Sequence, residues 1–523
     1  MSDRNIRVAG QNRGLVWTAT ACITVSLLVM IAISVAGPSV SVPAMPHTAG
    51  GPPWWVYLGL PNDVALFSLW AAAIVAAVGV GAGLLAVARG SRPRARTLVI
   101  VSFIVAAVFI VLPPAGTTDT QSYAIDGNML VLGHSPYVDT PQQAARLGDQ
   151  LAENSPNTWL NTLSDYGPLA TGEEWVSAEL GGSSMAAITF WLKLWVALAF
   201  CAVTLLFDRL LRGDPAMRLR ALLLWGLNPL LIWEIVASGH IDGLAIAFGI
   251  GGLVALRRGD MGGAESPIRG GSTGGRPPVP TLLLAGVLLG AAAAIKSPFV
   301  LFALGAAWAM RRKPTAIAIL AAGWLAAVIP GYVIAGMPAV KVLFQRGTQA
   351  TWDNLYQIFY RPFGVAGPFG ATYIPSHLDI IAGVVTVAVA VLALLRMPDR
   401  APGFPAVTPA LALALAWTLF WPYQRPWYDV MIVAPLVLYQ RSWLDWLVLV
   451  RLCFGAITYM EATAVSQFSW VQHFQFFEGE WITAGVRMLT AAALLWMCIS
   501  GRWGAEPSEP PVPATPPVLQ PQT

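Results

Sequence analysis

Residues 15–36 read LVWTATACITVSLLVMIAISVA, an apolar run without a single Asp, Glu, Lys or Arg. About 20 consecutive apolar residues in an α-helix cross the hydrocarbon core of a bilayer. The run is long enough to span a membrane, and no small-residue cleavage site clearly follows it. We expect it to form the first transmembrane helix.

The composition of the whole chain extends this interpretation. Of its 523 residues, 56% are apolar and only 11% are charged. Soluble domains carry roughly 25% charged residues, so this chain has too few charges to cover a soluble surface. A net charge of +4 cannot supply a phosphate-binding face, which excludes a nucleic-acid partner. The composition therefore predicts an all-α polytopic membrane protein embedded in a lipid bilayer.

About fourteen apolar stretches recur along the chain, which predicts a bundle of about 14 (12–14) transmembrane helices. Two of them, 281–295 and 298–310, are shorter than a full span and could form one kinked helix or a re-entrant pair broken at Pro298. The stretches cover residues 15–36, 64–88, 97–113, 184–207, 218–236, 241–256, 281–295, 298–310, 315–335, 378–395, 406–421, 427–440, 443–461 and 482–500.

Basic residues set the expected orientation. Arg and Lys gather at every second connection, for example at residues 89–96 and 311–313. Cytoplasmic loops carry the excess of Lys and Arg, so these connections and both termini are predicted to face the cytoplasm of a bacterial plasma membrane. The alternate connections would then face outward.

The expected organisation is one transmembrane domain over residues 1–503. Two large extracytoplasmic loops, 114–183 and 336–377, belong to it, and the first holds nine acidic residues but only one basic residue. Residues 259–280 are predicted to form a flexible cytoplasmic linker, and 504–523 a disordered, Pro-rich cytoplasmic tail.

Ionisable residues beside the spans gather at the predicted outer helix ends, with Arg451 as an exception at mid-depth. Such residues are costly near lipid, so the asymmetry favours one polar cleft at the outer face. The alternative is a set of interfacial side chains that reach toward water. The residues at the outer ends are Glu234, His240, Asp242, Lys296, Asp379, Arg425, Asp429, Glu461 and Arg487.

Asp119 is the candidate general base. It lies about five residues beyond the third apolar stretch, at the start of the acidic loop. A carboxylate held beside a dry cleft can have a raised pKa and abstract a proton. The alternative is an ordinary loop aspartate that caps or solvates the backbone.

Two further residues suggest an anion site. Lys296 at membrane depth requires an anionic partner, which could be a lipid phosphate or a neighbouring carboxylate such as Asp242. His240 could donate to a phosphate or a sugar hydroxyl, or it could be a structural histidine at a helix end.

The turn at residues 421–429 reads WPYQRPWYD. Aromatic faces stack on the apolar face of a sugar, and Gln424 or Arg425 can bind hydroxyls or phosphate. An interfacial aromatic belt would explain Trp427 and Tyr428 equally well, although it does not require the Gln-Arg pair.

Six motifs between residues 119 and 428 carry a family resemblance: Asp119-Thr120-Gln121-Ser122-Tyr123, Gly133-His134-Ser135-Pro136-Tyr137, Asp165-Tyr166-Gly167-Pro168-Leu169, Asn228-Pro229-Leu230-Leu231 with His240-Ile241-Asp242, Lys296-Ser297-Pro298 and Pro426-Trp427-Tyr428. In this order they resemble the actinobacterial polyprenyl-phosphomannose-dependent α-1,6-mannosyltransferases of lipoglycan synthesis, in the GT-C superfamily. Thr120-Gln121, Ile241 and the insertion of Arg425 after Gln424 depart from the family pattern.

The resemblance implies a GT-C-like membrane enzyme that transfers mannose from a lipid-phosphate donor to an extracytoplasmic glycan or lipoglycan, with inversion at the anomeric carbon. It implies that Asp119 is the catalytic base and that Lys296, His240 and Arg425 bind the donor phosphate. The residues expected to bind sugar or acceptor are Tyr123, Tyr137, Asp165, Tyr166, Asp242, Gln424, Trp427 and Tyr428.

No Asp-x-Asp or Asp-Asp pair occurs at Asp119, which favours a reaction without metal or other cofactor, although a divalent metal is not excluded. A transporter or flippase for lipid-linked sugars is the competing class, but it predicts paired half-sequences and midplane charges. An enzyme that transfers another sugar, such as arabinose, also remains open.

Overall fold

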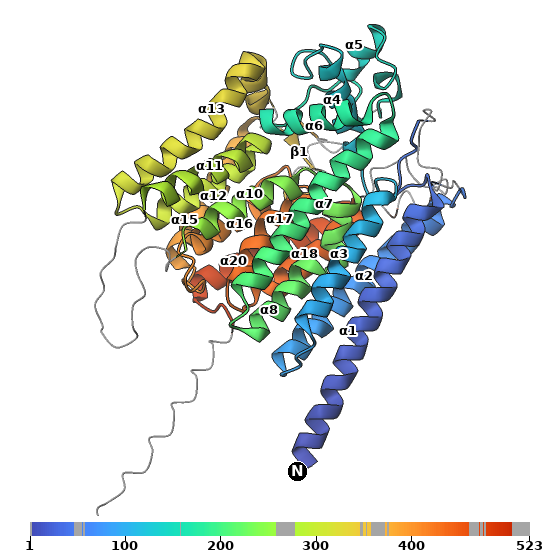
Figure 1. Cartoon of the computed structure of the whole chain (residues 1–523). Helices are drawn as coiled ribbons and strands as arrows, with labels where there is room; N and C mark the ends of the chain where they lie inside the picture. Colours follow the sequence, from blue (N-terminus) through green and yellow to red (C-terminus); the bar gives the residue numbers. More distant parts are fainter. Residues whose placement is uncertain are drawn as a thin grey trace, which may run out of the picture.

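The computed structural model is a bundle of helices with a small helical cap at one end (Figure 1). It describes residues 3–46, 55, 58–156, 158–257, 278–345, 349–351, 353–356, 372–373, 376–459, 470, 474 and 477–504. Within this part of the chain, the only paired strands are β1 (Gln349–Ala350) and β2 (Thr372–Tyr373), which are antiparallel. The predicted all-α class is therefore confirmed.

All fourteen predicted apolar stretches fall on helices. The helices in chain order are α1 (Asp3–Ala36), α2 (Asn62–Ala88), α3 (Ala95–Val111), α7 (Met185–Leu210), the bent segment from α8 (Pro215–Ala221) to α9 (Pro229–Ile232), α10 (Asp242–Ala255), α11 (Val279–Ile295), α12 (Val300–Ala309), α13 (Pro314–Gln345), α15 (Ser376–Arg396), α16 (Val407–Phe420), α17 (Val430–Leu438), α18 (Leu444–Thr458) and α20 (Ala484–Ser500).

The number of membrane crossings is a separate question from the position of the helices. Among the described residues, five helices are long and apolar enough to cross a membrane, and the bent α8–α9 segment makes a sixth. Most of the other apolar helices have between 10 and 17 residues, fewer than the roughly 20 that a straight crossing needs. The helices therefore support a membrane protein, but not a count of 14 crossings.

The break in the α8–α9 segment has a local cause. Asn228 caps the new helix, because its side-chain oxygen accepts a hydrogen bond from the Leu230 amide at 3.2 Å. Pro229 cannot donate to the preceding turn but fits the first position of a helix. The two halves meet at 41° as a result.

The first predicted loop, 114–183, is largely helical. It contains α4 (Asp119–Val131), α5 (Pro141–Arg146) and α6 (Pro168–Gly181), which lie at the end of the bundle opposite the N-terminus (Figure 1). α4 and α6 pack closely, since a side chain at Gly127 would overlap the Glu174 carbonyl. The acidic loop is therefore a packed cap over one end of the bundle.

The predicted second loop starts later in the structure, and most of the predicted linker and tail lies outside the described residues. Helix α13 continues past the predicted loop start at residue 336 to Gln345, with a break at Gly336, whose φ of 77° is left-handed. Residues 258–277, which make up most of the predicted linker, and the tail from residue 505 onward lie outside the described residues.

Small residues set the closest helix contacts. Gly286 and Gly290 on α11 face Gly323 and its neighbours on α13, and a side chain at any of the three would overlap backbone of the other helix. This small-xxx-small spacing lets helices approach where lipid offers no hydrophobic driving force. It fixes α11, whose last residue precedes Lys296.

Candidate functional site

Four charged side chains from separate parts of the chain meet beneath the cap. Asp119 begins α4, His240 lies in the turn before α10, Lys296 follows α11, and Arg425 precedes the short 3-10 turn Pro426–Asp429. All four are buried. Of the residues expected together at the outer helix ends, His240, Lys296 and Arg425 therefore come together near the start of α4, whereas the side chain of Asp379 and residue Glu461 lie outside the described part of the chain.

The Asp119 carboxylate lies beside His240 and Tyr123 and within the electrostatic influence of Arg425 and Lys296. Its Oδ2 lies 3.4 Å from Nε2 of His240 and accepts a 3.5 Å hydrogen bond from the Tyr123 hydroxyl. Burial raises the pKa of Asp119, but the hydrogen bond and charge of His240, with the charges of Arg425 and Lys296, outweigh burial and hold the pKa below its ordinary value. The carboxylate is therefore ionised at neutral pH, which reverses the raised pKa that we expected.

Asp119 also keeps one oxygen available. Its Oδ1 is buried and has no hydrogen-bond partner among the described residues. An ionised carboxylate with an unpaired oxygen can accept a proton from a nearby hydroxyl. The chemistry of a general base is thus present, even though the pKa is lowered.

His240 is fixed in one orientation. Its Nδ1 lies 2.5 Å from the Glu234 carbonyl oxygen, and its ring stacks on Trp427 with centroids 3.7 Å apart. A carbonyl oxygen only accepts, so Nδ1 carries the hydrogen and Nε2 points to Asp119. Gly239, with φ of 69°, makes the tight turn, and the hydroxyl of Thr120 donates to the Ser238 carbonyl beside it.

Lys296 was predicted to pair either with a lipid phosphate or with a neighbouring carboxylate, and in the structure it pairs with a carboxylate. Its Nζ lies 2.6 Å from Oδ2 of Asp242. The ammonium also lies 4.4 Å from the ring centre of Tyr428 and 5.4 Å from that of Tyr166. A lysine has three donors, and Asp242 accepts from one, so this pair does not prevent a second anion from binding.

The aromatic turn points inward. The Arg425 guanidinium lies 4.8 Å from the ring centre of Tyr459 and 5.0 Å from that of Tyr423. Trp427 and Tyr428 are both buried. An interfacial belt would expose these rings to lipid headgroups, so the structure favours a role inside the site.

Gln424 belongs to a buried ion-pair network rather than to the Asp119 cluster. Its Oε1 accepts from Arg487 at 2.8 Å and from Arg451 at 3.2 Å. Arg451 pairs with Asp429 at 2.6 Å, and Arg487 pairs with Asp353. This network anchors the turn that carries Arg425.

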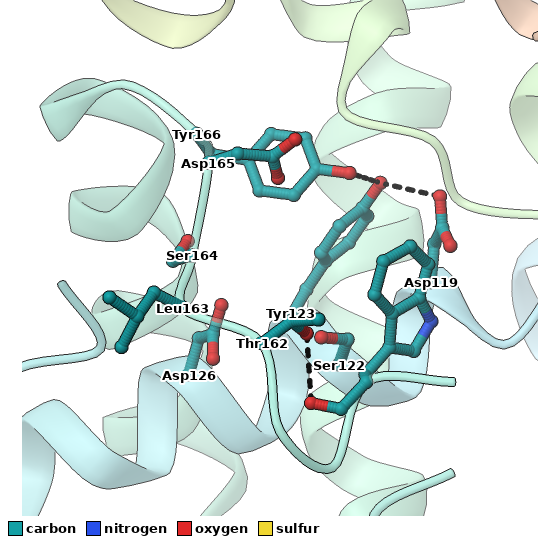
Figure 2. Close-up of a pocket in the computed structure, with 10 residues that line it drawn as sticks. Asp119, Ser122, Tyr123, Asp126, Thr162, Leu163, Ser164, Asp165 and Tyr166 are labelled. Atoms are coloured by element: carbon teal, nitrogen blue, oxygen red, sulfur yellow. Dashed lines mark hydrogen bonds between the residues drawn. The ribbon is translucent and has the colours of Figure 1, made fainter. Parts of the chain in front are cut away.

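The tyrosines connect the cap to the cluster. The hydroxyls of Tyr123 and Tyr166 lie 3.0 Å apart, and Figure 2 shows Tyr123 between Tyr166 and Asp119. Burial raises the pKa of both tyrosines, with added repulsion from neighbouring groups, so they remain protonated. Tyr137 lies one step further out, where its hydroxyl donates to the Tyr166 carbonyl at 3.0 Å.

The segment around Gly167 docks the cap onto α11. The Gly167 amide donates to the Ile295 carbonyl at 2.9 Å, and a side chain at Gly167 would overlap the Ala294 carbonyl. Tyr166 and Lys296 are consequently neighbours. Asp165 lines a cleft on the cap side of Asp119 (Figure 2).

Sequence reasoning missed two residues near the site. The buried Lys193 of α7 donates to the carbonyls of Leu112 and Pro113, at 2.7 and 3.2 Å, and so holds the end of α3 just before Asp119. Its signal was a lone lysine inside an apolar helix. Trp159 donates from Nε1 to the Thr118 hydroxyl at 3.1 Å, and nothing in its sequence context pointed to this contact.

An apolar groove runs between α6, α7, α10 and α11. It encloses about 1170 Å³ of empty space, part of it open to the surroundings. Three of its lining residues are close in sequence to the polar cluster: Leu169 follows Tyr166 by three positions, Leu244 follows Asp242 by two, and Ile295 precedes Lys296. The groove therefore reaches the chain segments that carry Tyr166, Asp242 and Lys296.

Metal-binding chemistry is not evident in the part of the chain that the structure describes. There, no three His, Cys, Asp or Glu side chains gather closely enough to hold a metal ion. Catalysis without a metal nevertheless stays a prediction.

A sequence model described as "Alpha-(1->6)-mannopyranosyltransferase, N-terminal domain" matches residues 12–312, more than half of the chain. The chain belongs to this α-(1→6)-mannopyranosyltransferase family. The match includes Asp119, His240 and Lys296 and ends before Arg425. The family resemblance that the motifs indicated is thereby confirmed.

Two mycobacterial relatives agree with the family assignment. The chain is 28% identical over 162 residues to an α-(1→6)-mannopyranosyltransferase of Mycobacterium tuberculosis, which covers 30% of this chain and 27% of the relative. It is 28% identical over 153 residues to a Mycolicibacterium smegmatis protein named "Probable alpha-(1->6)-mannopyranosyltransferase", which covers 29% and 27%. The matched segments thus span about a quarter of each relative.

Proposed function

We propose that the protein is an inverting α-1,6-mannosyltransferase that uses a polyprenyl-phosphate mannose as donor and an extracytoplasmic glycan or lipoglycan as acceptor. The observation that carries this proposal is the convergence of Asp119 with three cations near an apolar groove. The proposed donor combines an apolar chain, a phosphate and a sugar. The groove suits the apolar chain, the basic side chains suit the phosphate, and the aromatic turn suits the sugar.

The donor would bind across the groove and the cluster. An apolar chain gains by leaving water or by replacing lipid in the groove, while a phosphate needs donors and positive charge. The charges of His240, Arg425 and Lys296 all lower the pKa of Asp119, which supports a donor phosphate bound beside this carboxylate. Trp427 and Tyr428, whose rings contact His240 and Lys296, would line the mannose site beside the phosphate.

Asp119 would act as the single base. Its carboxylate takes the proton from an acceptor hydroxyl, whose oxygen then bonds to the anomeric carbon of mannose from the face opposite the phosphate. The bond between that carbon and the phosphate oxygen breaks, and the lipid phosphate leaves with the electron pair. One carboxylate is sufficient for inversion, whereas a retaining double displacement needs two.

The cations would stabilise the leaving phosphate. Negative charge develops on it as the bond breaks, and preorganised donors in a water-poor site stabilise such charge strongly. Because Nδ1 of His240 already donates to Glu234, only a hydrogen on Nε2 can face an anion, so His240 would act in its doubly protonated form.

The extracytoplasmic location rests on the distribution of basic residues. The connections rich in Arg and Lys alternate with those that carry Asp119, His240, Lys296 and Arg425. The positive-inside rule then assigns the cap and the cluster to the outer face.

The experiment is mannosyl transfer by membranes that contain the full chain. Wild type should transfer mannose from polyprenyl-phospho-β-mannose to a short α-1,6-mannoside and form an α-linked product, identified by NMR. Asp119→Asn should lose activity by at least about 100-fold, the usual contribution of a general base. Asp139→Asn is the control, since Asp139 lies in the same cap but pairs with His134 at 3.7 Å.

Absence of transfer in wild-type membranes, or full activity in Asp119→Asn, would contradict the proposal. Transfer of arabinose in place of mannose would correct the sugar and leave the base unchanged. Movement of the intact lipid-linked sugar across the bilayer without transfer would instead support the transporter that the composition left open.

A further inference from the structure

The cap contains a recess that shares no lining residue with the groove. It lies between α4 and the segment from Trp159 to Tyr166 (Figure 2). Its empty space is about 260 Å³, part of it open to the surroundings, and its enclosed part has room for about one water molecule. Asp119 forms one wall, so the recess reaches the candidate base directly.

The lining of the recess differs in chemistry from the groove. It contains no Lys or Arg but has carboxylates, hydroxyls and aromatic rings, contributed besides Asp119 and the tyrosines by Ser122, Asp126, Trp159, Thr162, Ser164 and Asp165. Carboxylates accept hydrogen bonds from sugar hydroxyls but repel anions. A lining of this kind suits an uncharged, hydroxyl-rich ligand.

Asp119 supplies the independent sign of a ligand. Its side chain is 2% exposed, and its Oδ1 has no hydrogen-bond partner among the described residues. A buried carboxylate oxygen without a donor carries a free-energy cost. A hydroxyl that enters from the recess would satisfy this oxygen and lie where the base needs it.

We propose, resting on the function above, that this recess is the acceptor subsite and takes the terminal uncharged pyranose of the acceptor glycan. Trp159 lies against the apolar face of the sugar, and Asp126 and Asp165 accept hydrogen bonds from its hydroxyls. The hydroxyl that becomes glycosylated points to Asp119.

The narrow recess must widen to admit a sugar ring. The wall that can move is the segment from Trp159 to Asp165, which is not helical and is held in place by hydrogen bonds to neighbouring parts of the chain. The Trp159 indole donates to Thr118, and the Ser164 amide donates to the Pro136 carbonyl at 2.9 Å. Opposite it, α4 packs tightly on α6 and does not yield.

The test separates acceptor from donor in purified full-length protein. Trp159→Ala should raise the acceptor KM about tenfold, a typical loss for one aromatic stacking contact, and leave the donor KM unchanged. Trp159→Phe should recover most of the affinity, and Asp126→Asn should raise the acceptor KM several-fold. Trp175→Ala is the matched control, because Trp175 is an exposed tryptophan of the neighbouring α6.

Binding without turnover makes the test independent of the proposed reaction. An octyl α-1,6-mannobioside should bind Asp119→Asn protein, and Trp159→Ala should weaken this binding. The same glycoside with a sulfate on its terminal sugar should bind at least tenfold more weakly.

The two proposals fail in different ways. Mannosyl transfer with an unchanged acceptor KM in Trp159→Ala and Trp159→Phe, or tight binding of the sulfated glycoside, would overturn the acceptor subsite and leave the transferase standing. Mannobioside binding that depends on Trp159, without turnover of any polyprenyl-phosphate sugar by wild type, would support the subsite and overturn the transferase.

Discussion

The two sides of Asp119 have opposite charge. His240, Arg425 and Lys296 lower the pKa of Asp119 through their charges, whereas the recess in the cap is lined by carboxylates, hydroxyls and aromatic rings without Lys or Arg. The cationic side is assembled from turns between bundle helices, and the recess comes from a single continuous part of the chain. The difference suggests that charge sorts the two substrates, with the phosphate of the donor on one side and the neutral acceptor on the other.

The largest expected effect lies on the cationic side. His240→Ala removes the imidazole that lies 3.4 Å from the Asp119 carboxylate and should lower kcat by about 100-fold or more, because one preorganised donor to a developing anion contributes this much. The acceptor KM should change little. Steady-state kinetics measure both values, and His134→Ala, at the partly exposed histidine of the cap, is the control.

A lower pH should not restore the activity of His240→Ala if the imidazole itself contacts the phosphate. If added imidazole restores the activity of His240→Ala, the result supports the role of His240 on the donor side. An unchanged kcat would remove His240 from the donor side.

The next largest effect is expected for a substitution that fills the groove. Ala202 lines it and is exposed, so Ala202→Trp should fill the groove without disturbing the core. We expect the KM for a long-chain polyprenyl donor to rise about tenfold, since a chain that loses two methylene contacts loses roughly 1.6 kcal/mol. A donor with a very short chain is the internal control, and an equal rise for both donors would contradict the assignment of the groove.

Gly167 joins the two sides, because it docks the cap on the end of α11. Gly167→Ala should cost about 1–3 kcal/mol of stability through overlap with the Ala294 carbonyl, and it should raise both KM values. Thermal unfolding and kinetics measure this. Gly172→Ala on α6 is the matched control, since its added methyl meets open space and should be neutral or slightly stabilising.

The smallest effect concerns Glu173, which lines the groove. Burial raises the pKa of its carboxyl from an ordinary 4.5 to about 8. The unfolded chain ionises first, so this group lowers the free energy of unfolding progressively between about pH 4.5 and pH 8 and adds no further change above. Ionisation above pH 8 should raise the donor KM a few-fold. Glu173→Gln should abolish the pH dependence of the donor KM and this group's contribution to the pH dependence of the free energy of unfolding.

Much of the fold was predictable because apolar stretches report burial. All fourteen fell on helices, and the turns that carry His240, Lys296 and Arg425, which the basic connections predicted to face the same side, come together near Asp119. The helices of the cap were not predicted. The buried residues of α4 mix polar Asp119, Thr120, Gln121 and Asp126 with apolar residues such as Ile125 and Met129, so the apolar periodicity that marks a helix is weak.

The candidate site was predicted as a set of residues, and the pair of Lys296 with Asp242 was one of two alternatives for that lysine, but the contact of Asp119 with His240 was not predicted. Asp119 and His240 are 121 positions apart, and no pattern along the chain reports that contact. Gln424 illustrates the same limit. Its place in a promising aromatic turn suggested a sugar ligand, but its amide oxygen accepts from Arg451 and Arg487, which lie 27 and 63 residues away.

The most direct test of the division at Asp119 is two-substrate kinetics on a pair of charge-altering variants, Arg425→Gln on one side and Asp126→Asn on the other. The account predicts a crossed result, in which Arg425→Gln raises the donor KM and spares the acceptor KM, and Asp126→Asn does the reverse. If both variants shift the KM of the same substrate, the two sides do not serve two substrates and the account is wrong.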